Sequence, residues 1–243
     1  MTNGLKKIEV CFTPAIFTCF QNPKAIVVVV DVLRASSAIC TAFMNGVHKI
    51  IPIGSVEEAR DLKNRGYLVA AERDGIVLDF ADFGNSPFNF TSERVKDKTI
   101  VYSTTNGTQA INLANSCYQV VVGSFLNISA LSDWLIKQQR DVIIFCAGWK
   151  NRFSLEDTIL AGAITEKLLT DAGLTTECDS ALASLDLWIT AKPNLMEYID
   201  KAAQRSRLQK NGLDDVIQFC LTPDQTSILP IYTNGFLTGI SGQ

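Results

Sequence analysis

The segment AIVVVVDVLRASS, residues 25–37, decides the fold class. Its first six residues are apolar and do not alternate with polar ones, which is typical of a strand covered by helices on both faces. A helical stretch begins near Ser36, so the segment predicts a buried strand that leads through a short connection into a helix. Asp31 and Arg34 lie in that connection, at the carboxyl end of the strand.

The same alternation of short apolar runs and helical stretches continues along the 243 residues. Further strands are predicted at Ile8–Phe12, Lys49–Ile53, Tyr67–Ala71, Thr99–Ser103, Gln119–Gly123 and Val142–Ala147. Helices are predicted at Ser36–Met44, Val56–Asn64, Thr108–Asn115, Ile128–Gln138, Leu155–Asp171, Cys178–Ala191, Asn194–Gln209 and Asp214–Cys220. This order predicts βαβ units and a layered α/β/α fold with a largely parallel or mixed sheet.

The last third of the chain has a different pattern. It is nearly all helical from Leu155 to Cys220, and two short strands then flank Asn234-Gly235, a typical hairpin turn. Residues 72–93 are too rich in Gly, Asp and Asn for a helix and predict a long ordered loop, a kind of segment that is often functional. We see no linker or repeat, so residues 1–243 are expected to form a single α/β domain.

Composition limits the kinds of partner. The formal net charge of -3 argues against a nucleic-acid binder, but it leaves room for a local cationic site that binds a small anion. The seven cysteines form no C-x-x-C pair, which favours a reducing, cytoplasmic location. The amino terminus lacks the apolar core of a signal peptide, and no apolar run approaches the roughly 20 residues of a membrane span.

Polar loops follow five of the predicted strands. They contain Asp31-Val32-Leu33-Arg34, Glu72-Arg73-Asp74-Gly75, Thr104-Thr105-Asn106-Gly107, Ser124-Phe125-Leu126-Asn127, and Gly148-Trp149-Lys150-Asn151-Arg152-Phe153-Ser154. The carboxyl ends of parallel strands share one edge of a sheet, where ligands bind, and several of these loops lead into helix amino termini that favour anions. The sequence therefore predicts an anion site at this edge.

Each loop also has a structural interpretation. Asp31 could cap the following helix, and Arg34 could be a solvated surface residue. The Thr104–Gly107 stretch could be only a turn, and Ser154-Leu155-Glu156-Asp157 fits a capping box. Asn127 has the position of a helix N-cap.

Cys146 and Arg152 suggest a different chemistry. Their C-x-x-x-x-x-R spacing between a strand and a helix is that of a phosphatase with a thiolate nucleophile. The bulky pair Trp149-Lys150 and the residue Phe153 do not fit the small loop that such enzymes use. A buried structural cysteine is the alternative.

Six motifs occur in one order along the chain: DVLRASS, AERDG with DFADFGNSP, STTNGTQA, GSFLNISA, CAGWKNRFSLEDTILAGA and GLDDVIQFCLTPDQTSILP. Together they resemble the 2-phosphosulfolactate phosphatase family. The resemblance implies an α/β fold of its own type, dependence on Mg²⁺ and hydrolysis of 2-phospho-3-sulfolactate, a step of coenzyme M synthesis in methanogens. The chain departs from the family in residues 203–208, where no histidine is present.

The resemblance implies that residues of the polar loops bind metal and substrate. Mg²⁺ is expected at Asp31 and Asp157, with Glu72 and Glu156 as further ligand candidates, since a hard cation prefers oxygen ligands. Asp31, Arg34 and Asp157 are the expected catalytic residues. Phosphate is expected at Arg34, Thr104, Thr105, Asn106 and Gly107. The rest of a small anionic phosphorylated metabolite is expected at Ser124, Asn127, Lys150, Arg152 and Ser154.

Three questions stay open at this point. The chain could instead be a Cys146-dependent phosphatase of another small phosphometabolite, or a protein that binds such a metabolite without turnover. Either Asp31 or a water molecule could be the nucleophile. The sequence is also compatible with a homo-oligomer.

Overall fold

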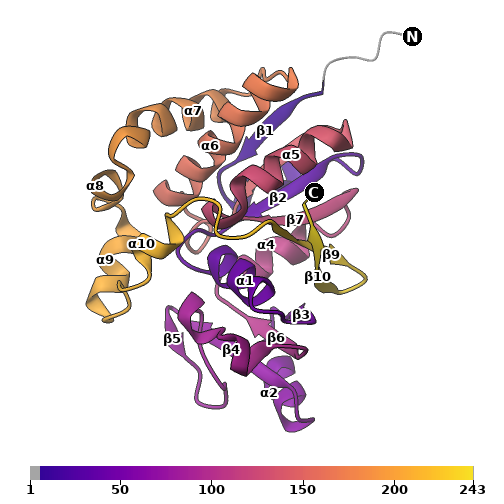
Figure 1. Ribbon diagram of the computed structural model, residues 1–243, viewed down its shortest axis with the longest axis vertical. Helices are drawn as coiled ribbons and strands as arrows, with labels where there is room; N and C mark the ends of the chain where they lie inside the picture. The colour runs from indigo at the N-terminus through magenta and orange to yellow at the C-terminus, as the bar shows by residue number, and fades with distance from the viewer. Residues whose placement is uncertain (1–5, 243) are drawn as a thin grey trace.

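A computed structural model describes residues 6–242, and its centre is one ten-stranded sheet (Figure 1). The strand order is β1-β8-β2-β7-β9-β10-β3-β6-β4-β5. The strands are β1 (Ile8–Cys11), β2 (Ile26–Val30), β3 (Lys49–Pro52), β4 (Leu68–Arg73), β5 (Ile76–Val77), β6 (Thr99–Ser103), β7 (Gln119–Gly123), β8 (Val142–Cys146), β9 (Ile228–Thr233) and β10 (Phe236–Ser241). Both groups β1-β8-β2-β7 and β3-β6-β4 are parallel, which confirms the predicted fold class.

The helices follow the predicted pattern closely as far as α7. They are α1 (Ala35–Met44), α2 (Val56–Asn64), α3 (Ser92–Val95), α4 (Gly107–Leu113), α5 (Ile128–Gln138), α6 (Leu155–Ala172), α7 (Asp179–Ala191), α8 (Leu195–Ile199), α9 (Ala203–Lys210) and α10 (Ile217–Cys220). Short 3₁₀ turns are η1 (Pro14–Cys19), η2 (Pro87–Asn89), η3 (Phe125–Asn127) and η4 (Lys192–Asn194). In Figure 1 the orange and yellow helices α7–α10 descend along one side of the molecule.

Strand β2 is buried along its whole length, as its unbroken apolar run predicts. Alternate side chains enter two different cores. Ile26, Val28 and Val30 pack in one cluster with residues of α5 and α6, whereas Val27 and Val29 pack in another with residues of α1 and α4. The strand is therefore covered on both faces, and its carboxyl end is held rigidly.

The carboxy-terminal hairpin lies in the middle of the sheet. Asn234 and Gly235 have φ of 52° and 91°, so they form the left-handed two-residue turn that the sequence predicts. The hairpin joins the two parallel groups, because β9 pairs with β7 and β10 pairs with β3. The ladder between β10 and β3 is short and pairs Leu237 with Ile50.

The sheet bends strongly at this junction. Five strand spacings separate β2 from β6, which would place them about 24 Å apart in a flat sheet. Loops that follow strands of the two groups nevertheless touch, since the Lys150 amide donates to Asn106 Oδ1 at 2.9 Å. One core cluster includes both Val29 of β2 and Ile100 of β6. The bend therefore brings the carboxyl ends of both parallel groups to one place.

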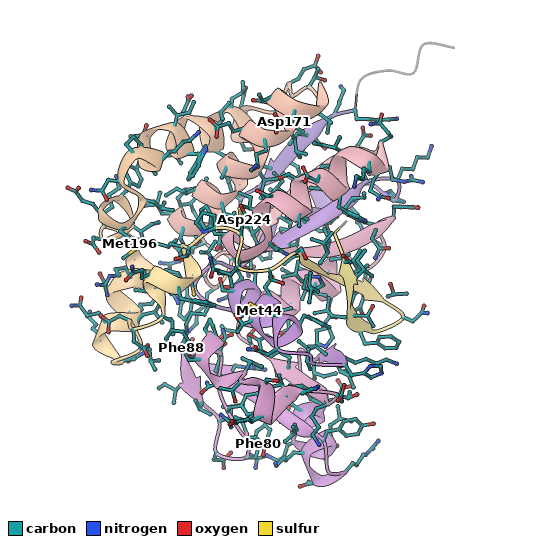
Figure 2. The ribbon with its side chains drawn as sticks, in the orientation of Figure 1. Met44, Phe80, Phe88, Asp171, Met196 and Asp224 are labelled. Carbon is teal, nitrogen blue, oxygen red and sulfur yellow. The ribbon has the colours of Figure 1, made fainter. Side chains whose placement is uncertain are left out.

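Two local predictions need correction. The predicted helix over residues 194–209 is wrong, because the chain turns between α8 and α9, where the Ala202 amide donates to the Ile199 carbonyl at 2.8 Å. The predicted loop over residues 72–93 holds the end of β4, the short strand β5 and the turn η2. Figure 2 shows Phe88 of η2 beside the carboxy-terminal helices, where its ring centroid lies 5.6 Å from that of Phe219.

Within the described residues, no helix combines the length and the apolar character that a membrane span requires.

Candidate active site

A small polar cavity of about 20 Å³ lies where the two parallel groups meet. Its lining comes from loops after β2, β4, β6 and β8, from the loop before η2, and from α9. The lining residues are Asp31, Leu33, Arg34, Glu72, Gly75, Asn85, Asn106, Trp149 and Gln204. Four predicted site residues, Asp31, Arg34, Glu72 and Asn106, are thus brought together by the bend of the sheet.

Asp31 is the central acid of this cavity. Burial, with the nearby charges of Glu72 and Glu156, raises the pKa of Asp31 to about 7, although the Ala35 amide and Arg34 oppose the shift. Its Oδ1 accepts a long 3.4 Å hydrogen bond from the amide of Ala35, the first residue of α1, so Asp31 caps this helix only weakly. The carboxylate is therefore held among like charges and keeps oxygen lone pairs free.

Glu72 and Asp157 have their oxygens engaged by backbone groups. Glu72 accepts from the Thr105 amide at 2.8 Å and from the Gly75 amide at 2.6 Å, so it fixes two loops at the cavity. Asp157 accepts from the Val32 amide at 2.8 Å and from the Gly148 amide at 3.1 Å. It therefore connects the loops after β2 and β8.

The start of α6 shows no capping box. Ser154 makes no side-chain cap hydrogen bond, so the structural interpretation of the Ser154–Asp157 motif is wrong. Burial raises the pKa of Glu156, and burial with the charges of Glu156 and Asp31 raises the pKa of Asp157 well above its usual value. Three acids thus repel one another in a buried region.

Arg34 is 4% exposed and faces this acidic group. Among residues 6–242, no hydrogen bond or salt bridge engages its guanidinium group. Burial lowers the pKa of Arg34, and the charge of Glu72 partly opposes the shift. An arginine whose five N–H donors have no internal acceptor in a buried cavity is suited to bind an anionic ligand.

The donor set fits a hard divalent cation. Asp31 and Glu72 line the cavity, and the charges of Glu156 and Asp31 act on Asp157, so four carboxyl groups gather in this region. Burial first, and then neighbouring acidic charges, raise the pKa values of Asp31 and Asp157. In the described part of the chain, no three acidic, cysteine or histidine side chains are placed closely enough to hold a metal ion by themselves. Mg²⁺ commonly uses only one or two carboxylates, with water and substrate phosphate as its other ligands. The residues therefore fit a Mg²⁺ ion that also takes water or substrate ligands, but they do not fit a metal ion held by protein ligands alone.

The remaining predicted phosphate contacts lie beside the cavity and have internal partners. Thr104 Oγ1 accepts from the Thr108 amide at 3.2 Å, so part of the predicted turn is a helix cap. Thr105 Oγ1 accepts from the Asp74 amide at 3.0 Å. Gly107 begins α4 where a Cβ atom would come within 2.7 Å of Ala35 Cβ and 3.0 Å of Asp31 Oδ2. Glycine at this position thus allows α4 to approach the central acid.

The structure does not place the other predicted substrate contacts in the cavity lining. Ser124 and Asn127 are buried and form a capping box with each other at η3. Lys150 forms a 2.7 Å salt bridge with Asp74, and Arg152 is exposed. Ser154 is buried, and its hydroxyl has no hydrogen-bond partner within residues 6–242. Direct contacts of these residues with substrate stay predictions.

Sequence reasoning missed several lining residues. Asn85 and Trp149 lie in loops that the motifs had marked, and Asn85 Oδ1 accepts a hydrogen bond from the buried Tyr102 hydroxyl. Gln204 comes from α9, and its amide donates to the Leu33 carbonyl at 2.9 Å. No local pattern in residues 203–210 indicates this contact, because it joins positions 171 residues apart.

A larger cavity of about 630 Å³ opens beside the same loops. Gly54, Arg73, Thr104, Thr105, Gln109, Asn112 and Leu113 line it. Its one cation, Arg73, donates to the Glu72 and Gly54 carbonyls and to Ser103 Oγ. The chemistry of the smaller cavity is therefore the better basis for a phosphate site, despite its size.

Cys146 is a poor candidate for a thiolate nucleophile. It is fully buried at the end of β8 and belongs to the hydrophobic core. Burial and the charge of Asp157 raise the pKa of its thiol well above the usual value. A nucleophilic cysteine requires the opposite shift.

Comparison with known proteins agrees with the motifs. A family model described as 2-phosphosulpholactate phosphatase matches residues 11–235. A protein of Caldanaerobacter subterraneus subsp. tengcongensis, named probable 2-phosphosulfolactate phosphatase, is 38% identical over 215 residues, which cover 87% of this chain and 89% of that protein. A protein of the same name from Thermotoga maritima is 40% identical over 210 residues, which cover 86% and 89%. The chain therefore belongs to the 2-phosphosulfolactate phosphatase family.

Proposed function

We propose that this protein hydrolyses the phosphate monoester of a small anionic C3 acid, most directly 2-phospho-3-sulfolactate, to give 3-sulfolactate and phosphate. The names of its relatives and the family model indicate a phosphoric monoester hydrolase. The observation that carries the proposal is Arg34, a buried cation that has no partner within residues 6–242 and faces acidic side chains in one cavity.

The residues divide into an anion side and an acid side. Arg34 binds the phosphoryl oxygens, and the side-chain amides of Asn85 and Asn106 lie in the same lining. Asp31, at the rigid end of β2, is placed either to attack phosphorus or to orient the attacking water. In both cases catalysis depends chiefly on positioning and charge neutralisation.

We assign a Mg²⁺ ion to Asp31 and Asp157, with Glu72 and Glu156 as further candidate ligands. When bound, it would supply positive charge to the phosphoryl oxygens. The acidic groups support this assignment because the site otherwise combines four carboxyl groups with an anionic substrate. The free cysteines support a reducing, cytoplasmic setting for the enzyme.

The test is phosphate release from a panel of 2-phospho-3-sulfolactate, 2-phospholactate, phosphoenolpyruvate and glycerol 2-phosphate, each with Mg²⁺ and with EDTA. We expect release with Mg²⁺, loss in EDTA and recovery when Mg²⁺ is restored. Activity that survives EDTA but is lost on thiol alkylation would support the Cys146 mechanism instead. No release from any substrate would favour a binding protein without turnover.

A further inference from the structure

Helix α9 brings a second arginine to the candidate active site. Arg207 Nε donates to Gln204 Oε1 at 2.7 Å, and the Arg207 guanidinium carbon lies 4.4 Å from the centre of the Trp149 ring. Gln204 and Trp149 both line the small cavity. Two independent contacts therefore hold Arg207 against the wall of this site.

The guanidinium group of Arg207 is held but not neutralised. Stacking on Trp149 and the Nε hydrogen bond fix its plane, while no salt bridge within residues 6–242 involves its Nη atoms. The charge of Glu156 acts on Arg207, but burial has the larger effect and lowers the pKa of Arg207. A planar guanidinium group that is fixed in place and whose Nη donors have no acceptor favours bidentate binding of an oxyanion.

Neighbouring cations are engaged elsewhere. Lys150 pairs with Asp74 at 2.7 Å, and Arg73 donates to Gly54 and Glu72 carbonyls. On α9 itself, Arg205 bonds Asp200 at 3.3 Å and Asp214 at 2.9 Å. Arg205 and Arg207 thus lie two residues apart on one helix, yet only Arg205 has carboxylate partners.

A buried hydroxyl lies at the start of α6, close in sequence to the acid that acts on Arg207. Ser154 is 7% exposed, and its Oγ has no hydrogen-bond partner among the described residues. It directly precedes the turn of α6 that carries Glu156, the acid whose charge acts on Arg207. A buried polar atom without a partner is costly, and a ligand oxygen would satisfy it.

We propose that Arg207 is a specificity-determining residue that binds one of the two other anionic groups of the substrate, its sulfonate or its carboxylate, while Arg34 binds the phosphate. This inference rests on the proposed function. Sequence reasoning gives the role to Lys150 and Arg152, but the first is paired and the second is exposed. The helical carboxy-terminal third thereby selects substrates that carry an anionic group besides the phosphate over simple phosphomonoesters.

The test compares Arg207→Gln and Arg207→Lys with the control Arg205→Gln. The readout is the ratio of kcat/KM for 2-phospho-3-sulfolactate to kcat/KM for glycerol 2-phosphate, which has neither a sulfonate nor a carboxylate. Arg207→Gln should lower this ratio by about 10- to 100-fold, the range of a lost charge-assisted hydrogen bond. Arg207→Lys should give a smaller loss because it keeps the charge without the fork. Arg205→Gln should leave the ratio within about twofold, since its partners lie outside the cavity.

A ratio within twofold of wild type in both Arg207 variants would overturn the inference, and so would an equal loss on both substrates, which indicates a structural role. If Arg207→Gln does not fold, judged by circular dichroism, Arg207→Lys alone decides. Calorimetric titration with 3-sulfolactate and with inorganic phosphate separates this inference from the proposed function. Weaker binding of 3-sulfolactate to Arg207→Gln, with phosphate binding retained, would support Arg207 even if wild type hydrolysed no phosphomonoester.

Discussion

At the scale of single residues, Asp31 and Asp157 differ in what their carboxylate oxygens contact. Asp157 receives two backbone amides, from Val32 and Gly148, whereas Asp31 receives one long hydrogen bond from Ala35. The same chemical change should therefore affect them differently. Asparagine removes the negative charge of an acid that lies among like charges. It has only one acceptor oxygen, however, so it cannot accept hydrogen bonds from two backbone amides at two different oxygens.

Asp157→Asn should lower stability. In wild type the Val32 and Gly148 amides each donate to one carboxylate oxygen of Asp157. In the variant the NH₂ group faces one of these amides, so two buried donors point at each other without an acceptor. We expect a loss of about 1–3 kcal/mol in the free energy of unfolding, measured by urea denaturation in EDTA. Asp171→Asn is the control, because Asp171 is an exposed residue at the far end of the same helix (Figure 2). Equal stability of the Asp157 variant and wild type would contradict this role.

The sequence predicts which polar residues form the site better than it predicts what each of them does. Asp31, Arg34, Glu72 and Asn106 can be found because each follows a strand that has a strong local pattern. The connection of Asp157 to Val32 spans 125 positions, so no local pattern could distinguish it from a helix cap. No sequence pattern indicates that Arg207 belongs to the site, because its contacts depend on where α9 packs.

At the scale of elements, two short loops meet beside the cavity. The β4–β5 turn carries Asp74, the loop after β8 carries Lys150, and their side chains pair at 2.7 Å. The enclosed space is about 20 Å³. Ligand pockets are usually about 300–1,000 Å³, so we expect these loops to separate when a substrate enters.

Asp74→Asn tests this closing contact. Asp74 has a φ of 55°, a conformation that asparagine adopts readily, so the backbone should be undisturbed. Both side chains of the pair are more than half exposed, so stability should change by less than about 1 kcal/mol. We expect kcat/KM to fall about 3- to 10-fold, because closure excludes water from the site.

A double-mutant cycle with Lys150→Met gives the control. If the pair acts only through closure, the two single variants should lose similar activity and the double variant little more. A normal Asp74→Asn enzyme beside a strongly impaired Lys150→Met enzyme would contradict closure and favour direct binding of substrate by Lys150.

At the scale of the whole molecule, the carboxy-terminal hairpin joins the two parallel groups of strands. Its existence could be predicted from Asn234-Gly235, since a two-residue turn has a local signature. Its insertion between β7 and β3 could not, because pairing partners more than a hundred residues away are not encoded in a local pattern. The bend that assembles the cavity escaped prediction for the same reason.

Leu237→Ala should weaken this junction. Leu237 is fully buried in β10 and pairs in the ladder with Ile50 of β3. Truncating it should cost about 2–5 kcal/mol of unfolding free energy, measured by urea denaturation. Ile240→Ala on the same strand is the control, since Ile240 is 37% exposed and should cost clearly less. Equal effects of the two substitutions would contradict a central role for the hairpin.

We propose that Asp31, a buried acid at the end of β2 that shares a cavity with Arg34, forms the catalytic centre of a Mg²⁺-dependent phosphatase. The most direct test is phosphate release from 2-phospho-3-sulfolactate by wild type and Asp31→Asn at saturating Mg²⁺, with Tm measured in EDTA. We expect Asp31→Asn to lose at least about 100-fold in kcat. We also expect an unchanged or higher Tm, because the substitution removes one of several repelling buried charges. A folded Asp31→Asn protein with normal Mg²⁺-dependent turnover would contradict the account.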